Sequence, residues 1–309
     1  MPTPAGAKLA AITGATGFVG PHLVAALARH GWKFRLLMRR WTPLPSLPGV
    51  EAEIVWGDLS DETSLKRLVA GAEAVVHCAG LIKARRPIDF DRVNRDGTAR
   101  LSALAPDVPF LMLSSLAARE PQLSPYAASK RAAEEVVAQR SGHWLAVRAP
   151  AVYGPGDRET LAYFKMAARG FALQPNQPDA RLSLIHVEDL AEALALALDR
   201  SPSPGVYEID DGHPDGYRHA DMAAAAAEAL GRPVWPIRMG RGPMNAVAGL
   251  NSLRPGAQIL SLAKVRELYH PDWTVHEHGL ADALGFAARY GLVDGFRHTI
   301  LWYRQRHWL

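Results

Sequence analysis

Three glycines in one short turn near the start of the chain constrain its fold most strongly. An apolar run begins at Leu9 and ends in a turn that carries Gly14, Gly17 and Gly20, and a helical apolar pattern follows from Pro21. Only glycine lets a chain turn this sharply and leaves bare backbone against which a pyrophosphate can lie. The following helix directs unpaired N–H groups and a positive dipole end at such a phosphate. The spacing, G-x-x-G-x-x-G, is a variant of the commoner G-x-G-x-x-G, so the stretch predicts a dinucleotide site or, alternatively, a plain strand-to-helix turn.

Strand-like and helix-like patterns alternate through the first half of the chain. The strands expected after the first one cover residues 33–38, 52–58, 74–80, 109–115 and 143–148. The helices expected between them cover residues 21–29, 62–69, 90–105 and 126–140. This alternation predicts an α/β fold with a Rossmann-type doubly wound parallel sheet and right-handed crossovers. Ligands of such sheets bind beyond the carboxyl ends of the strands.

The pattern changes after about residue 155. We expect a dinucleotide-binding domain over residues 1–155 and a smaller C-terminal substrate-binding lobe over residues 156–309, with residues 184–212 returning to the first domain. A chain of 309 residues is long enough for two lobes that share one cleft. The later expected elements are a proline-bearing loop at 171–180, helices at 190–198, 220–230 and 295–306, and a strand at 205–210; the rest is expected to be loops rich in Gly and Pro.

Polar residues follow the third expected strand. Asp58, with Leu59 beside it, lies where a side chain can meet the adenine amino group of a dinucleotide. Alternatively Asp58, Ser60 or Asp61 begins the next helix as its N-cap. Both interpretations can hold for different residues of this group.

The next two expected strands end in small or hydroxyl side chains. Ala79 and Gly80 leave room for a cofactor to pass close to the backbone, whereas His77 and Cys78, just before them, are expected to pack in the core. Ser114 ends the fifth strand. The glycine turn and these residues all fall at carboxyl ends of strands, which is the strongest structural argument for a cofactor groove.

Two arginines end the second expected strand. In dinucleotide folds that use NAD, an Asp or Glu usually stands near this place to hold the ribose hydroxyls. Arg39 and Arg40 instead suit the 2′-phosphate of NADP, which they can bind by forked, charge-assisted hydrogen bonds. We therefore expect NADP in preference to NAD, with a solvated basic turn as the alternative.

A tyrosine and a lysine four residues apart carry the chemistry. On a helix, Tyr126 and Lys130 share one face. A free phenol has a pKa of about 10, and a nearby ammonium favours its ionised form, so Tyr126 can exchange a proton with a carbonyl or alcohol oxygen. Lys130 would also hold the nicotinamide ribose, and Ser115 would donate a hydrogen bond to the same substrate oxygen. Asn94 would anchor the helix that carries Tyr126 and Lys130, or a water that leads to Lys130. Each feature alone is also common on helix surfaces and in turns.

Together these motifs resemble the extended short-chain dehydrogenases/reductases, specifically the NAD-dependent epimerases/dehydratases. The similar segments are residues 13–20, 57–59, 75–80, 93–98, 114–115, 126–130, 148–157, 186–190 and 295–303. The resemblance implies that Ser115, Tyr126 and Lys130 are catalytic, with the choice between Ser114 and Ser115 left open. The motifs and the resemblance together assign cofactor contacts to Gly14, Thr16, Gly17, Phe18, Val19, Gly20, Arg39, Arg40, Asp58, Leu59, Ala79, Gly80, Ser114, Tyr126, Lys130, Ala149, Pro150 and Val152.

The resemblance implies NAD(P)-dependent hydride transfer to or from a ketone or secondary alcohol. Residues 116–118 read Leu-Ala-Ala, where the sugar dehydratases of the family carry an acidic pair, so dehydratase chemistry is disfavoured. The small and apolar stretch 239–250 favours a sterol- or flavanol-like substrate. The alternatives are a nucleotide-sugar epimerase and a non-catalytic NAD(P)-binding subunit or sensor. No clear basic cluster for a diphosphate stands out, although several arginines are available: Arg218, Arg232, Arg238, Arg241 and Arg254.

Composition limits the remaining functions. A net charge of +4 with scattered basic residues indicates no nucleic-acid groove. The single cysteine excludes an internal disulfide and suits a reducing cytosol, and neither a signal peptide nor a transmembrane segment is expected, so we predict a cytoplasmic enzyme. No metal site is expected from residue spacing. Family members often pair through helices equivalent to 90–105 and 126–140, so we predict a homodimer acting on a small-molecule substrate.

Overall fold

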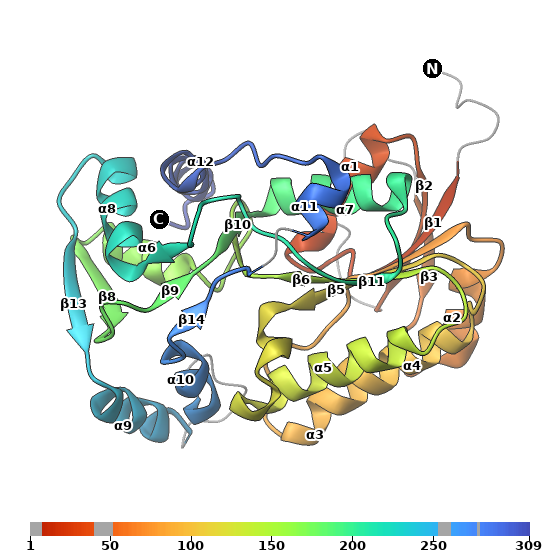
Figure 1. Cartoon of the computed structure of the whole chain (residues 1–309), viewed down its shortest axis with the longest axis horizontal. Coiled ribbons are helices and arrows are strands. Elements are labelled where there is room, and N and C mark those ends of the chain that lie inside the picture. The colour runs from red at the N-terminus through yellow and green to blue at the C-terminus, as the bar shows by residue number, and fades with distance from the viewer. Residues whose placement is uncertain (1–7, 40–51, 253–260, 277–278) are drawn as a thin grey trace.

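A seven-stranded parallel sheet organises the structure, a computed structural model that describes residues 8–39, 52–252, 261–276 and 279–309 (Figure 1). The strand order is β11-β6-β5-β4-β1-β2-β3. The chain enters at β1, runs outward to β3, and then crosses back to β4, so the point where the strand order reverses lies between β1 and β4. The strands are β1 (Leu9–Thr13), β2 (Lys33–Met38), β3 (Ala52–Trp56), β4 (Ala74–His77), β5 (Phe110–Ser115), β6 (Trp144–Ala149) and β11 (Gly205–Glu208). The predicted α/β, Rossmann-type fold is confirmed.

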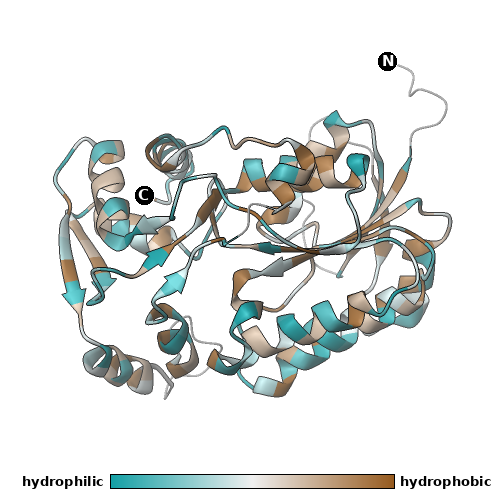
Figure 2. Ribbon diagram, in the orientation of Figure 1, coloured by the Kyte–Doolittle hydropathy of each residue, from teal (hydrophilic) through white to brown (hydrophobic). Residues whose placement is uncertain are grey.

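Helices cover both faces of this sheet and bury two separate apolar layers. On one face, α1 packs against α7, with α11 beside α7; on the other lie α2, α4 and α5. Figure 2 shows apolar strands between helices whose outer faces are polar. The bounds are α1 (Val19–Arg29), α2 (Glu62–Val69), α3 (Pro87–Phe90), η1 (Asp91–Arg95), α4 (Asp96–Ala103), η2 (Leu116–Arg119), η3 (Pro121–Leu123), α5 (Pro125–Ala138), α7 (Val187–Arg200) and α11 (Gly279–Leu284).

The remaining elements form a C-terminal lobe beside the carboxyl ends of the sheet (Figure 1). Aromatic side chains fill its core, where Tyr153, Phe164 and Phe296 meet edge to face and Tyr303 packs on Phe164. Among the described residues, no helix combines the length and apolarity needed to cross a membrane. The lobe's elements are β7 (Ala151–Tyr153), α6 (Leu161–Ala167), β8 (Phe171–Pro175), β9 (Arg181–Leu182), β10 (Leu184–His186), β12 (Tyr217–Arg218), α8 (His219–Leu230), β13 (Trp235–Met239), α9 (Arg241–Ser252), α10 (Leu262–Leu268), β14 (Asp272–Trp273) and α12 (Leu292–Gln305).

Several segments of the second half that were expected to be loops are regular elements, among them α6, β13, α10 and α11, and two others, β8 and α9, show the reason. Residues 171–175 form β8, because β13 pairs with them in parallel over their whole length. Residues 241–252 form α9, whose Pro243 lies in the first turn, where its missing N–H costs no helical hydrogen bond. Both errors share a cause: distant packing partners outweigh local Gly and Pro content. The predicted helix 90–105 is divided into α3, the π-helical turn η1 and α4.

Candidate active site

The glycine turn lies at the point where the strand order reverses, between β1 and the end of β4. Gly14 has φ +80°, and a Cβ on it would stand 2.5 Å from the backbone nitrogen of Ala79. A Cβ on Gly20 would stand 2.3 Å from the carbonyl oxygen of Gly14, which already accepts a hydrogen bond from the N–H of Gly17 at 2.9 Å. Backbone contacts on two sides therefore exclude a Cβ at Gly14 and Gly20, and we call this turn the glycine cradle.

The first turn of α1 fits a phosphate. The helix begins at Val19, with Phe18 as its N-cap, and no side chain caps it or places a carboxylate in its first turn. Its N–H groups and positive dipole end are thus left for an anion. The glycine cradle supplies the bare backbone that a pyrophosphate needs, so the residues present fit a dinucleotide.

One described arginine and a carboxylate stand after β2 and β3, the two strands that follow β1 in the sheet. Arg39 is exposed, and its charge helps to lower the pKa of Asp58, after the larger effect of hydrogen bonds from Ser60. Ser60 donates both its N–H, at 2.7 Å, and its hydroxyl, at 2.5 Å, to Oδ1 of Asp58. Asp61 caps α2 through Thr63, so the N-cap alternative holds for Asp61. Arg40 lies outside the described residues.

The end of β4 forms the wall facing the glycine turn. His77 is buried between hydroxyls of Thr13 at 2.7 Å and Thr98 at 2.9 Å, and burial lowers its pKa to about 3. The core assignment of His77 is confirmed. Cys78 is partly exposed in the cavity wall, and burial raises the pKa of its thiol to about 12, which leaves it unreactive at neutral pH.

Ser115 and Tyr126 meet at the carboxyl end of β5. Their side chains share a hydrogen bond, and the edge of the Phe90 ring packs on the Tyr126 ring at 6.1 Å between centroids. Burial raises the pKa of Tyr126 to about 12; the Ser115 hydrogen bond opposes this shift and the carboxylate of Glu267 adds to it. The phenol in this structure therefore keeps its proton at neutral pH, contrary to the expected lowering of its pKa, and is suited to donate that proton as an acid.

Lys130 lies one turn along α5 from Tyr126. Its ammonium donates to the carbonyl oxygen of Leu113 at 2.6 Å, and burial lowers its pKa to about 8, while the Glu134 carboxylate opposes that shift. The amine is buried, and it is not among the groups that line the cavity described below.

Ser114 points away from Tyr126 into a buried ionic network that sequence reasoning missed. Its hydroxyl donates to Oε1 of Glu134 at 2.5 Å, and Arg148 forms a two-pronged pair with the same carboxylate at 2.7 and 3.0 Å. Arg148 and Arg119 both reach Glu208 on β11. The spacing of Glu134, four residues after Lys130 on one helix, was the available signal. With Ser114 engaged in this way, Ser115 is the hydroxyl that faces Tyr126.

Asn94 ties two parts of the site together from the π-helical turn η1. Its Oδ1 accepts from the N–H of Leu81 at 2.7 Å, and its Nδ2 donates to the Leu81 carbonyl and to the hydroxyl of Ser129. The chain after β4 is thereby fixed to α5, the helix that carries Tyr126 and Lys130. The anchoring role expected for Asn94 is confirmed.

A cavity of about 1300 Å³ runs from the glycine turn past Tyr126 into the C-terminal lobe. Its lobe side is lined by apolar side chains that come from four separated elements: Phe164 of α6, Leu173 of β8, Met222 of α8 and Met244 of α9. None of the four described arginines that were considered for a diphosphate (218, 232, 238 and 241) lines it. The apolar stretch 239–250 indicated one part of this wall, but the other segments could not be assigned to it, because they meet only in the folded chain.

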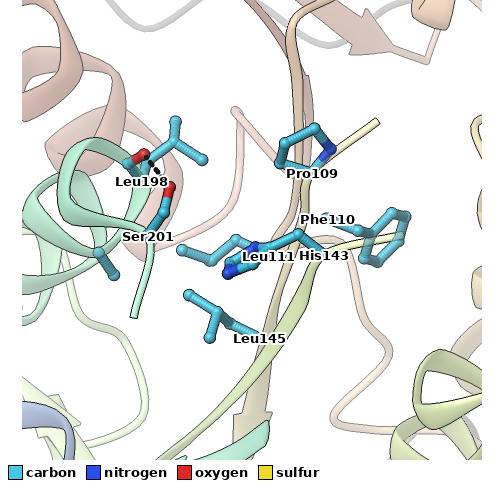
Figure 3. A pocket seen from close by; sticks show the side chains of 8 residues that line it. Pro109, Phe110, Leu111, His143, Leu145, Leu198 and Ser201 are labelled. Carbon is cyan, nitrogen blue, oxygen red and sulfur yellow. Dashed lines mark hydrogen bonds between the residues drawn. The ribbon is translucent and has the colours of Figure 1, made fainter. Parts of the chain in front are cut away.

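A second hollow lies at the opposite, amino-terminal ends of β5 and β6. Figure 3 shows it between Pro109, Leu111, His143 and Leu145 on one side and the end of α7 on the other. Its volume is about 10 Å³, and the imidazole of His143 is already bound to the Pro202 carbonyl at 2.7 Å. It is a packing void and not a ligand site.

Three side chains near the start of α7 bring potential metal ligands within 4.8 Å of one another: His186, Glu188 and His298. The N–H of Glu188 donates to Nδ1 of His186 at 3.2 Å, so the proton of that ring is assigned to Nε2, which lies 3.3 Å from Nδ1 of His298. A metal on Nε2 would force this proton onto Nδ1, opposite a backbone N–H. Tyr290 donates to the Glu188 carboxylate at 3.0 Å. These contacts make the cluster a hydrogen-bond chain.

The parallel sheet, its reversal point and the polar groups gathered there define an α/β enzyme that binds a dinucleotide. Within that class, the chain belongs to the NAD dependent epimerase/dehydratase family, whose profile matches residues 10–210. It is therefore an NAD(P)-dependent enzyme of the oxidoreductase/epimerase type, and its cofactor is NAD or NADP.

Several known proteins are similar to this chain over much of their length. A ceramide reductase of Caulobacter vibrioides is 46% identical over 305 residues, which cover 97% of this chain and 95% of that protein. A 4-hydroxy-2-methyl-3-oxo-4-farnesyl-3,4-dihydroquinoline-1-oxide ketoreductase of Stigmatella aurantiaca is 28% identical over 227 residues, 66% of this chain and 68% of that protein. The structure of MoeE5 with UDP-glucose and NAD matches with a TM-score of 0.74 and 25% identity, covering 97% of this chain and 99% of that one.

Proposed function

We propose that this enzyme reduces the ketone of a long-chain, ceramide-type lipid, with NADPH as the preferred reductant. The observation that carries the proposal is the cavity of about 1300 Å³ with an apolar wall that leads to Ser115 and Tyr126. Sites for drug-sized ligands usually measure ~300–1,000 Å³, so this cavity has room for more than the cofactor. The similarity to a ceramide reductase points to the same class of lipid.

The substrate group is a ketone for chemical reasons. A ceramide contains an amide and hydroxyl groups, and a nicotinamide hydride does not reduce an amide. A reductase of this lipid class therefore acts on a ketone at a carbon of the sphingoid chain and produces a secondary alcohol. The apolar side chains of the C-terminal lobe, among them Leu173, Met222 and Met244, would bury the alkyl chains.

Tyr126 would act as the acid. It keeps its proton at neutral pH, shares a hydrogen bond with Ser115, and both side chains line the cavity. A ketone oxygen held between the two hydroxyls would receive hydrogen bonds that strengthen as negative charge develops on it, and Tyr126 would then give up its proton. The Lys130 ammonium would stabilise the phenolate that remains, since it lies on the same face of α5.

The cofactor, when bound, supplies the hydride. Its pyrophosphate would lie on Gly14, Gly17 and the first turn of α1, because no side chain fills that cradle. The exposed Arg39 would contact the 2′-phosphate of NADP. Lys130 would hold the nicotinamide ribose, and the backbone after β6, at Ala149 to Val152, would line the ring.

The direct test is turnover of a keto lipid. The purified enzyme is mixed with NADPH and an N-acylated 3-keto sphingoid lipid in detergent micelles, and the loss of NADPH absorbance is followed together with the alcohol product. NADPH oxidation that depends on the lipid is expected. Turnover of short ketones alone, with no response to the long-chain lipid, would overturn the proposed substrate and leave the ketoreductase chemistry standing.

A nucleotide-sugar epimerase is the second candidate, favoured by the likeness to MoeE5 bound to UDP-glucose. An epimerase oxidises and re-reduces the same sugar, so it keeps its NAD and shows no net consumption of NADPH. Incubation with UDP-glucose and separation of the products distinguishes the two. We expect no interconversion, because the cavity wall in the C-terminal lobe is largely apolar.

A further inference from the structure

Two exposed apolar side chains stand at the mouth of the cavity. Ile82, after β4, is 56% exposed and Leu262, at the start of α10, is 50% exposed, yet both also line the cavity. A side chain that lines the cavity and is also exposed to solvent lies at the opening of the cavity. Isolated exposed apolar residues are common, but residues at such an opening determine what can enter it.

Further apolar side chains surround this mouth and form, with the first two, a patch that we call the rim. Ile88 belongs to α3, whose neighbours Pro87 and Phe90 line the cavity. On α9, Met244 and Ala248 face the cavity, whereas Val247 and Leu250 are exposed on another face of the helix. Figure 1 places α3, α10 and α9 along one edge of the molecule. The rim consists of Ile82, Ile88, Val247, Leu250 and Leu262.

The segments that carry the rim are basic. Residues 81–92, 241–252 and 261–268 contain seven Lys or Arg and three Asp or Glu. Two of the basic residues are paired, Lys264 with the buried Glu267 and Lys83 with Glu159, so the segments keep a smaller positive excess. Arg85 and Arg241 are exposed beside the apolar residues.

Apolar side chains ringed by cations match one kind of partner. An anionic bilayer accepts apolar side chains below the headgroups and attracts Lys and Arg to its surface. A lipid with two alkyl chains has almost no free concentration in water, so it must pass from the bilayer into the cavity. Met244 is buried on the cavity side of α9, whereas Leu250 is 68% exposed on another face, where a membrane would bury it.

We propose that the rim docks on an anionic lipid bilayer and that the cavity mouth receives its substrate directly from that bilayer. The inference rests on the proposed function for the identity of the substrate, but docking itself can be measured without turnover. The protein would lie on the membrane surface through the rim.

The test is co-sedimentation with lipid vesicles. The wild-type enzyme, saturated with NADPH, is mixed with vesicles of phosphatidylcholine or of phosphatidylcholine with phosphatidylglycerol. Binding to the anionic vesicles should be at least tenfold stronger and should weaken at high salt. Ile88→Asp with Leu250→Asp, and separately Arg92→Glu with Arg241→Glu, should each reduce binding about tenfold, since all four side chains are exposed and none lines the cavity. The matched control is Leu301→Asp with Arg304→Glu on α12, both exposed and away from the rim, which should bind like wild type.

Four outcomes separate the two proposals. Equal turnover of micellar keto lipid by wild type and rim variants, with loss of vesicle binding only in the variants, supports docking. Turnover without any vesicle binding by the wild type overturns docking and leaves the proposed function intact. A wild-type dimer in light scattering that the rim variants convert to monomers also overturns docking, because a second copy would then cover the rim. Vesicle binding without turnover supports docking and contradicts the proposed substrate. Melting temperatures with NADPH establish that each variant is folded.

Discussion

The two ends of the cavity are built in opposite ways. At the cofactor end, consecutive residues of β1, the glycine turn and α1 form the surface, and backbone atoms determine its shape. At the other end, which we propose binds the lipid and call the lipid end, single side chains from α6, β8, α8 and α9 form an apolar wall. The first surface tolerates almost no change, because a single Cβ meets main chain. The second can change residue by residue, which suits a family that keeps one cofactor chemistry and varies its substrates.

The largest effect on turnover is expected for Tyr126→Phe, because Tyr126 lines the cavity between the cofactor end and the lipid end. Removal of the phenolic proton donor should lower kcat/KM for the keto lipid by roughly 10²–10⁴-fold. NADPH binding and the melting temperature should stay close to wild type. Tyr207→Phe is the control. Tyr207 lies on the edge strand β11, and its hydroxyl donates to the carbonyl oxygen of Ser203. Unchanged turnover in Tyr126→Phe would remove Tyr126 from the mechanism.

A Cβ in the glycine cradle should nearly abolish cofactor binding. Gly14→Ala places that atom 2.5 Å from the Ala79 nitrogen at φ +80°. Gly31→Ala has the same φ but meets nothing within 4 Å, so it isolates backbone strain, about 1–2 kcal/mol. We expect Gly14→Ala to melt lower than Gly31→Ala and to lose the NADPH-induced rise in melting temperature. Equal NADPH-induced shifts in the two variants would contradict a cofactor site at this turn.

The pH dependence of reduction should reveal Lys130. Its pKa is lowered to about 8 by burial, whereas Tyr126 keeps its proton to about pH 12. Turnover should therefore be level up to about pH 8 and fall about tenfold per unit above it, as the ammonium is lost. Stability should change in the other direction: between pH 8 and the ordinary lysine pKa only the unfolded chain holds this proton, so the free energy of unfolding rises with pH. In Lys130→Arg the alkaline fall in rate should disappear.

The choice of cofactor tests the polar edge of the groove. Arg39→Ala should weaken NADPH binding roughly fivefold and leave NADH binding unchanged, because the side chain is exposed and its ion pair is screened by solvent. Arg29→Ala, on the last turn of α1, is a matched loss of charge away from the groove. Equal weakening of both cofactors would mean that Arg39 does not contact a 2′-phosphate.

The smallest effect is expected at the lipid end. Ala263→Trp should narrow the cavity from α10 and raise KM for the long-chain keto lipid a few-fold, while a short-chain ketone retains its rate. Ala246→Trp adds the same ring on the exposed side of α9, outside the cavity lining. A loss of rate with the short ketone as well would show that the substitution disturbs the site around Tyr126 and not the chain-binding wall.

The sequence alone predicted the strand, glycine turn and helix at the cofactor end of the cavity, because their information is local. The fold keeps two short-range features of the sequence. They are the spacing of Gly14, Gly17 and Gly20 in one turn and the four-residue step from Tyr126 to Lys130 on one helix. The same reasoning failed at β8 and α9, where pairing with β13 and packing on α10 decide the structure. It also missed Glu134, whose partners lie on two strands. The domain boundaries, the homodimer and the roles of the site residues remain predictions.

The ionic network beneath Tyr126 ends on main-chain atoms of the C-terminal lobe. Arg119 donates to the carbonyl oxygens of Thr274, at 2.7 Å, and Asp272, at 3.3 Å. Every amino acid has a carbonyl oxygen at these two positions, so the two hydrogen bonds from Arg119 do not depend on the side chains of residues 272 and 274. Substitutions at residues 272 and 274 of the pocket-forming half should consequently leave these two hydrogen bonds to the half that carries Tyr126 in place.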